Sequence, residues 1–153
     1  MNKSNIANLK NTLSLVCDKA NSKDSFAIEY IEGEMGPKIP IVEEMQSRCG
    51  LLGVYYYNGW GVRQSYEKAF QYSKKSCDLG YGGGCFGVGR AYRDGKGVEK
   101  DFKKALTFFT KACDLKDGDG CVEVGEFYYK GANLSKAKEF YGIACDLGAQ
   151  KKL

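Results

Sequence analysis

Apolar and small residues recur three, four and seven positions apart in three stretches of the chain, a spacing that places them on one face of an α-helix. Each stretch starts at a cysteine and ends at a glycine: CGLLGVYYYNG from Cys49, CFGVGRAYRDG from Cys85 and CVEVGEFYYKG from Cys121. These cysteines lie 36 residues apart both times (85 − 49 and 121 − 85). Because a glycine commonly ends a helix, the pattern predicts one helix at the start of each repeating period.

A second helix is predicted in each period, from the stretches SYEKAFQYSKKSCDLG, DFKKALTFFTKACDLK and NLSKAKEFYGIACDLG. A short polar side chain stands at each N-cap position, where its oxygen accepts a hydrogen bond from a backbone N–H group; these are Ser65, Asp101 and Asn133. An alanine, an aromatic residue and a cysteine follow in register: Ala69, Ala105, Ala137; Tyr72, Phe108, Phe140; Cys77, Cys113, Cys145. The alanines permit close helix contact, and the aromatic rings fill the space between layers.

Each period is therefore a helical hairpin that cannot bury its apolar face alone, so the hairpins must stack. We predict an all-α fold, an α/α solenoid of stacked helix-turn-helix repeats wound as a right-handed superhelix. The repeats are placed at 49–84, 85–120 and 121–148, with a tail at 149–153, in a single folding unit. The last repeat is shorter, since it lacks the Gly-Val turn found at Gly61-Val62 and Gly97-Val98.

Residues 1–48 match the repeat less well and are predicted to form a degenerate N-terminal cap. Cys17 falls in the position of Cys113, but Ser25 stands where Cys121 would be. Two prolines in GPKIP oppose a continuous helix, so residues 40–48 are expected to form a shortened second helix of their own.

The arrangement G-x-x-Y-x-x-G-x-G-V, then K-A, an aromatic residue and A-C-D-L-G, resembles the Sel-one-like repeat (SLR) family, in particular its cysteine-rich bacterial, Hcp-type branch. The resemblance covers residues 49–148. It implies disulfides between Cys77 and Cys85 and between Cys113 and Cys121, across the connector that joins one hairpin to the next.

The residues themselves leave other roles open for these cysteines. Reduced cysteines packed as small apolar side chains are the main alternative. A zinc site or a redox pair fits less well, because the seven-residue spacing matches neither zinc-ligand pairs nor C-x-x-C. Cys17, Cys49 and Cys145 have no cysteine at the repeat offset, and Cys145 is expected to be a free thiol. The connector glycines are expected to supply positive φ angles and close helix contact.

Composition narrows the function. The net charge of +4 comes from dispersed lysines, so nucleic acid is not an expected partner, and no apolar run is long enough to span a membrane. Without a leader the sequence as written predicts a cytoplasmic protein, or a periplasmic or secreted one if a leader was removed. Seven cysteines favour an oxidising compartment. No histidine is present, which excludes Ser-His-Asp and Cys-His catalysis. We predict no metal and no cofactor.

Some Hcp-type relatives are described as binding or slowly hydrolysing β-lactams, and S-x-x-K occurs at Ser65-Lys68 and Ser135-Lys138. The S-D-N and K-T-G motifs that accompany it in penicillin-interacting enzymes are absent. Because Ser65 stands in an N-cap position and Ser135 at an exposed helix position, we predict no catalytic residues.

Stacked hairpins curve and present an extended concave face suited to protein or peptide partners. Positions of the first helices that packing leaves free to vary are the candidate contacts, together with a tryptophan in a turn: Tyr57, Arg93, Tyr129; Val54, Arg90, Glu126; Asn58, Asp94, Lys130; and Trp60. We predict a monomeric, non-catalytic protein-binding module. By analogy within the SLR family its partner is a toxin domain, which would make it an immunity protein; the alternative is a secreted Hcp-type protein with β-lactam binding or weak β-lactamase activity.

Overall fold

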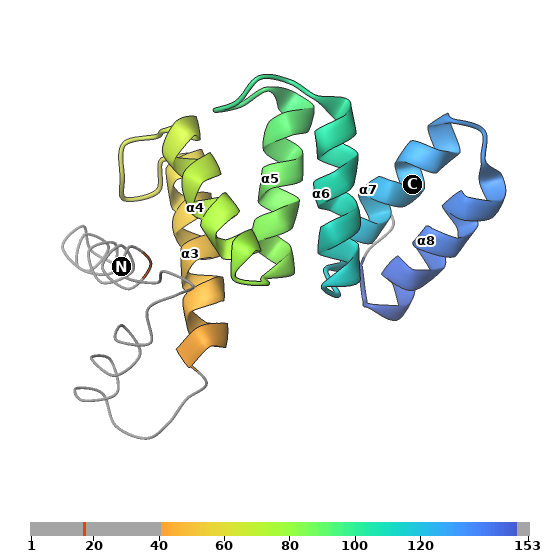
Figure 1. The fold of residues 1–153 in the computed structure, drawn as a ribbon, viewed down its shortest axis with the longest axis horizontal. Coiled ribbons are helices and arrows are strands. Elements are labelled where there is room, and N and C mark those ends of the chain that lie inside the picture. The colour runs from red at the N-terminus through yellow and green to blue at the C-terminus, as the bar shows by residue number, and fades with distance from the viewer. Residues whose placement is uncertain (1–16, 18–40, 150–153) are drawn as a thin grey trace.

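The computed structural model describes residue 17 and residues 41–149 of the chain. The predicted cap therefore lies largely outside the described residues, as does the end of the tail. Within them the only regular elements are helices: α3 (Ile41–Asn58), α4 (Tyr66–Asp78), α5 (Gly82–Asp94), α6 (Phe102–Asp114), α7 (Gly118–Lys130) and α8 (Leu134–Asp146). Consecutive helices pair into hairpins, α3 with α4, α5 with α6 and α7 with α8, which follow one another along the molecule (Figure 1). The predicted all-α solenoid of helical repeats is confirmed, and the hand of its superhelix stays a prediction.

One predicted helix boundary is wrong. Residues 41–48 do not form a separate helix ahead of Cys49, because α3 continues from Ile41 to Asn58 without a break. Both prolines precede this segment, and no proline or glycine interrupts it before Gly50. The extension is tied to the end of α4: the Gln46 side-chain amide donates to the Leu79 carbonyl, and Ser76 Oγ donates to the Gln46 carbonyl oxygen at 2.6 Å.

Each hairpin is held together by a stacked pair of aromatic rings, one from each helix. The ring centroids are 5.5 Å apart for Tyr56 and Tyr72, 5.8 Å for Tyr92 and Phe108, and 5.7 Å for Tyr128 and Phe140. The second helices begin at the expected N-caps, whose side-chain oxygens accept from the backbone N–H three residues on: Ser65, Asp101 and Asn133. Sequence periodicity thus predicted both the pairing and the start of these helices.

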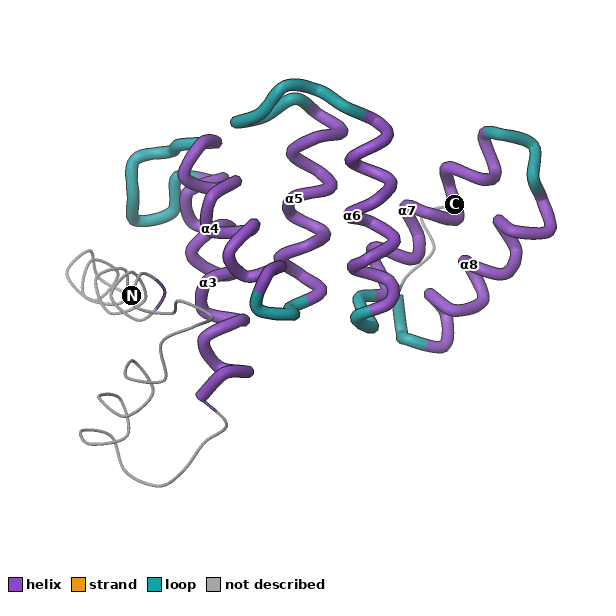
Figure 2. Tube along the Cα trace, viewed as in Figure 1, coloured by secondary structure: helices purple, strands orange, loops and turns teal. Residues whose placement is uncertain are grey.

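Loops within hairpins lie at one end of the array, and connectors between hairpins lie at the other (Figure 2). The connectors carry the disulfides Cys77–Cys85 and Cys113–Cys121, with Cα atoms 4.5 and 4.6 Å apart. These are the pairs that the family resemblance implied. The close approach requires glycine: a Cβ atom at Gly84 would lie 2.6 Å from the backbone nitrogen of Cys77. Gly80, in the same connector, has a φ of 93°.

The remaining cysteines include a pair that the repeat did not predict. Cys17 and Cys49 form a disulfide with their Cα atoms 5.2 Å apart, although they are 32 residues apart in the chain. Neither has a cysteine at the offset used by the two connectors, so register alone could not find this pair. Cys145 is exposed and unpaired, as expected.

The first helices of the hairpins, α3, α5 and α7, pack from one repeat to the next, most closely between α3 and α5. The second helices contact mainly the first helices on either side of them. Because the array is tighter along its first helices, it curves toward them. We call the free side of α3, α5 and α7 the inner face.

Candidate protein-binding surface

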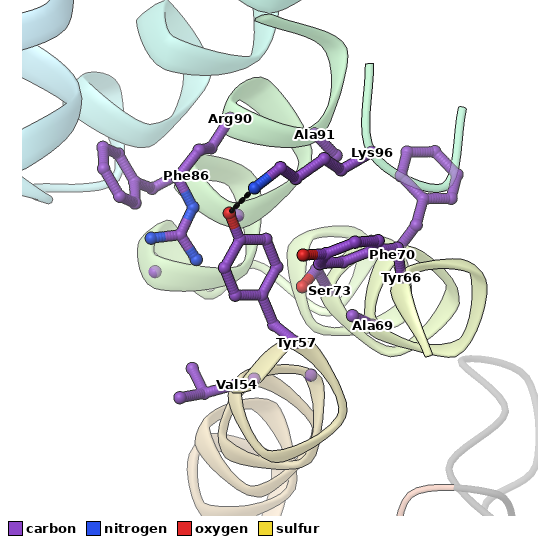
Figure 3. A pocket seen from close by; sticks show the side chains of 14 residues that line it. Val54, Tyr57, Tyr66, Ala69, Phe70, Ser73, Phe86, Arg90, Ala91 and Lys96 are labelled. Atoms are coloured by element: carbon purple, nitrogen blue, oxygen red, sulfur yellow. Dashed lines mark hydrogen bonds between the residues drawn. The ribbon is translucent and has the colours of Figure 1, made fainter. Parts of the chain in front are cut away.

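A cavity of about 160 Å³ lies where α3, α4 and α5 meet, and we call it the Arg90 pocket (Figure 3). Its walls come from two consecutive repeats: Val54, Tyr57, Tyr66, Ser73, Phe86, Arg90 and Lys96 are among the residues that line it. At this place α3 and α5 pack closely on Ser73 of α4 through Gly53 and Gly87. A Cβ atom at either glycine would lie within 2.8 Å of Ser73 Oγ.

Arg90 supplies the main charge of this pocket. Its guanidinium carbon lies 4.3 Å from the centre of the Tyr57 ring and 5.8 Å from that of Phe86. Arginine is favoured over aromatic faces because the ring quadrupole attracts a cation. Nε of Arg90 is buried and has no hydrogen-bond partner among the described residues. The group lies against the two rings, and its Nε–H donor is left unused.

Lys96 brings a second positive charge to the same pocket from the loop after α5. Its Nζ donates to the hydroxyl oxygen of Tyr57 at 3.3 Å and lies 5.1 Å from the ring centre of Tyr66. The hydrogen bond to Tyr57, followed by the charges of Tyr57 and Tyr66, raises the pKa of Lys96. The lysine therefore stays charged at neutral pH.

A second cavity, of about 210 Å³, lies one repeat further along, between α5, α6 and α7. We call it the Arg93 pocket; it includes Arg93, Phe102, Phe109, Glu123, Glu126 and Lys130. Its charges are paired. Arg93 Nη1 donates to Glu123 Oε1 at 2.9 Å, and Lys130 Nζ lies 3.2 Å from Glu126 Oε1.

Arg93 also binds Asp94 on its own helix, with Nε and Nη2 donating to the two carboxylate oxygens at 3.0 and 3.3 Å. The hydrogen bond with Asp94 is the largest cause of the raised pKa of Arg93, with Glu123 adding to it against the effect of burial. In turn Arg93 lowers the pKa of Asp94. Arg93 and Asp94 are therefore both charged at neutral pH.

The predicted contact residues are divided between these two pockets and the surface around them. Tyr57 and Arg90 line the first pocket, as does Val54; Arg93, Glu126 and Lys130 line the second. Asn58, Trp60, Asp94 and Tyr129 line neither of them. Tyr129 and Trp60 are among the most exposed large side chains, with 60% and 57% of their surface accessible.

Sequence reasoning missed several residues of the Arg90 pocket, including Lys96, Ser73 and Phe86. Lys96 could have been found, because it occupies the turn position that Trp60 holds one repeat earlier. Ser73 also carries a signal, since the equivalent position one period later is Phe109. A small residue in place of a large one at a packed repeat position indicates a gap.

The serines of the S-x-x-K motifs have structural surroundings. Ser65 Oγ accepts from the backbone N–H of Lys68 at 3.2 Å and so caps α4. Ser135 is exposed in the first turn of α8. No cluster of three or more His, Cys, Asp or Glu residues suited to a metal ion occurs in the described part of the chain. Across residues 41–149, none of the helices combines the length and apolar character needed to cross a membrane.

Comparison with solved structures shows the fold. A Sel1 repeat protein from Oxalobacter formigenes is 21% identical and superposes with a TM-score of 0.65, over 95% of this chain and 56% of that one. A protective antigen of uropathogenic Escherichia coli with an SLR fold is 24% identical, with a TM-score of 0.64, over 89% of this chain and 33% of that one. The chain thus spans about half of the first protein and a third of the second.

Helicobacter pylori cysteine-rich protein B also matches, at 27% identity and a TM-score of 0.49, over 79% of this chain and 96% of that one. No curated protein matches the chain. The family model of the Sel1 repeat matches three times in succession, at residues 48–81, 83–117 and 118–148. Together with the helical hairpins and their stacking, these matches show that the chain belongs to the Sel1 repeat family, whose members are protein-interaction modules.

Proposed function

We propose that this chain binds a protein or peptide partner on its inner face and catalyses no reaction. The observation that carries the proposal is the concentration of arginine and aromatic side chains on the free side of the first helices. Arg90 and Tyr57 lie together in one pocket, Arg93 lines the next, and Tyr129 is exposed beyond it. Arginine and tyrosine are enriched among residues that dominate binding energy at interfaces.

A paired set of variants tests where the partner binds. The inner-face variant combines Tyr57→Ala, Arg93→Ala and Tyr129→Ala. The matched outer-face variant combines Lys103→Ala, Lys111→Ala and Lys138→Ala, all exposed on second helices. Both are compared with the parent chain in affinity capture from the native host, after thermal melting has shown that each variant is folded.

We expect one stoichiometric partner with the parent chain and the outer-face variant, and its loss with the inner-face variant. Equal recovery by both variants would contradict binding at the inner face. Sedimentation of the purified chain in the same buffer checks the predicted monomer.

The toxin domain stays a prediction about which partner is bound. An immunity protein of this kind would work in the cytoplasm, where glutathione and thioredoxin keep thiols reduced. Disulfides at Cys17–Cys49, Cys77–Cys85 and Cys113–Cys121 instead favour an oxidising compartment, and we propose that the chain works in one. A thiol count on denatured protein from the native host separates the two: one free thiol is expected, and seven would favour the cytoplasmic role.

The β-lactam alternative has no comparable support, because the capping role of Ser65 accounts for the S-x-x-K motif at that position. Nitrocefin turnover by the purified chain, abolished by Ser65→Ala or Ser135→Ala, would reverse this judgement.

A further inference from the structure

In the Arg90 pocket a half-buried cation has one buried hydrogen-bond donor without an acceptor among the described residues. Nε of Arg90 is buried without a partner, and the guanidinium group is held instead between the rings of Tyr57 and Phe86. Buried polar groups are nearly always hydrogen-bonded, and each exception calls for an explanation. A bound ligand that supplies the acceptor is one such explanation, and the charges around the pocket support it.

The acidic residues that could neutralise Arg90 are engaged elsewhere. Asp94, one turn further along the same helix, accepts from Arg93 with both carboxylate oxygens. Glu123 accepts from Arg93 as well, and Glu126 pairs with Lys130. Lys96, the second cation at the pocket, has tyrosine hydroxyls as its partners, that of Tyr57 at 3.3 Å and that of Tyr66. Two positive charges therefore face one cavity that no carboxylate lines; Asp94 lies near enough for both to lower its pKa, but its two oxygens are bound by Arg93.

The cavity has the size and wall chemistry to take one side chain. Its volume is about 160 Å³, and an apolar cavity of about 150 Å³ in another protein is enough to hold a benzene ring. One side of the space is apolar, at Val54 and Phe86, and Figure 3 shows the guanidinium group of Arg90 beside Tyr57. An occupant should combine a short apolar stem with an anionic end.

We propose that the Arg90 pocket is a subsite for one Asp or Glu side chain of the protein partner, an inference that rests on the proposed protein-binding function. The carboxylate lies on the donor edge of the Arg90 guanidinium group and near Lys96, and its stem packs against Phe86. Guanidinium and carboxylate groups match in planar, two-bond geometry, and lysine adds a point charge. A glutamine of the same shape would leave the cavity itself without a counter-charge for its two cations, so the subsite selects the acid over the amide.

A library of random displayed peptides, panned against the complete oxidised chain, supplies the probe. The tightest peptide is then synthesised with Glu, Gln or phosphoserine at its acidic position, and each affinity is measured by titration calorimetry. We expect Gln in place of Glu to weaken binding about tenfold or more, as a charge-assisted hydrogen bond is lost. Arg90→Gln should remove this difference, and Arg63→Gln, the same charge change in an exposed loop, should preserve it.

A measurement on the unaltered chain makes the test independent of how Arg90→Gln folds. The Nε–Hε resonance of Arg90 should shift on addition of the Glu peptide and move much less with the Gln peptide. Together with the calorimetry, this shift places the carboxylate at Arg90.

The outcomes separate the subsite from the function on which it rests. If no peptide is enriched, both the protein-binding function and the subsite are overturned. If peptides are enriched without an acidic preference, or the Glu-to-Gln difference persists in Arg90→Gln, the subsite alone is overturned. A phosphoserine peptide that binds about tenfold tighter than the Glu peptide would overturn the assignment to a carboxylate.

Discussion

The Arg90 and Arg93 pockets occupy equivalent places in consecutive repeats, but their charges are arranged in opposite ways. In the first, Ser73 and Gly87 leave a space in which Arg90 has no carboxylate partner. One period later the same positions are Phe109, which packs on Gly89, and Glu123, which pairs with Arg93. One backbone arrangement thus leaves an open pocket between repeats or closes it with packing and an ion pair, depending on a few side chains.

The largest expected effect on stability comes from a substitution that opens the Arg93 pocket, so that it resembles the Arg90 pocket. Phe109 is 4% exposed, and its ring lies 5.7 Å from that of Phe86 in the preceding helix. Phe109→Ala should therefore lower the free energy of unfolding by about 3–5 kcal/mol, the usual cost of truncating a buried phenylalanine.

Denaturant unfolding measures this loss, with Phe102→Ala as the control because Phe102 is 63% exposed. The control should change stability by less than about 0.5 kcal/mol. A loss of similar size in both variants would mean that Phe109 is not the residue that fills the space between α5, α6 and α7.

The disulfides should contribute alike at the two connectors, whatever the difference between the pockets. Both bonds join cysteines separated by 8 residues, so they remove similar amounts of chain entropy from the unfolded state. Replacing either pair with alanine should cost about 2–3 kcal/mol in the loop-entropy model. The measurement is the midpoint of urea unfolding, with Cys145→Ala as the control.

Removal of the Cys113–Cys121 bond could lower the free energy of unfolding much more than removal of Cys77–Cys85. The two connectors would then differ in their backbone as well as in their side chains. Equal losses would confine the difference to the side chains of the pockets.

The fold could be predicted from the sequence because the features that define it recur in register. Small residues, aromatic partners and N-caps such as Asp101 repeat at a fixed offset, and stacking follows from that periodicity. The continuous helix α3 was missed because the repeat was taken to begin at Cys49, which divided one helix into two. The Cys17–Cys49 bond was missed because it joins a residue of the irregular region to the array.

The residues that line the two pockets could be predicted only in part, for a related reason. Variation between repeats identified Tyr57 and Arg90, since neither is needed for the common packing. It could not show that Arg90 lies on Tyr57, because these residues belong to different repeats and meet only when the hairpins stack. Nor could it show that Arg93 is bound by Glu123, which is 30 residues away in the chain.

Acid should lower the free energy of unfolding through the Arg93–Asp94 pair, by less than the substitutions described above. Arg93 lowers the pKa of Asp94, so this carboxylate stabilises the fold at neutral pH and loses that effect as the pH falls from about 4 through its lowered folded value. The effect should be less than about 1 kcal/mol, because the pair is partly exposed. Asp94→Asn should flatten the fall of unfolding free energy between pH 7 and 3.

Asp114→Asn is the matched control, as Asp114 is exposed and makes no ion pair among the described residues. An equal flattening by both variants would show that the acid dependence reflects net charge and not the Arg93 network.

The smallest expected change in stability is at Arg90, where the comparison is sharpest. Arg90→Met keeps an apolar stem against Tyr57 and Phe86 but removes the unpartnered buried Nε–H. Loss of the cation–π contact should cost about 0.5–1 kcal/mol. Removal of the unsatisfied donor should offset this cost, because a buried donor without a partner carries a penalty of about 1–3 kcal/mol. The net free energy of unfolding should stay the same or rise. Arg93→Met breaks the pairs with Asp94 and Glu123 and should lower the free energy of unfolding in the same urea titration. An equal loss in both variants would mean that Arg90 stabilises the fold as Arg93 does.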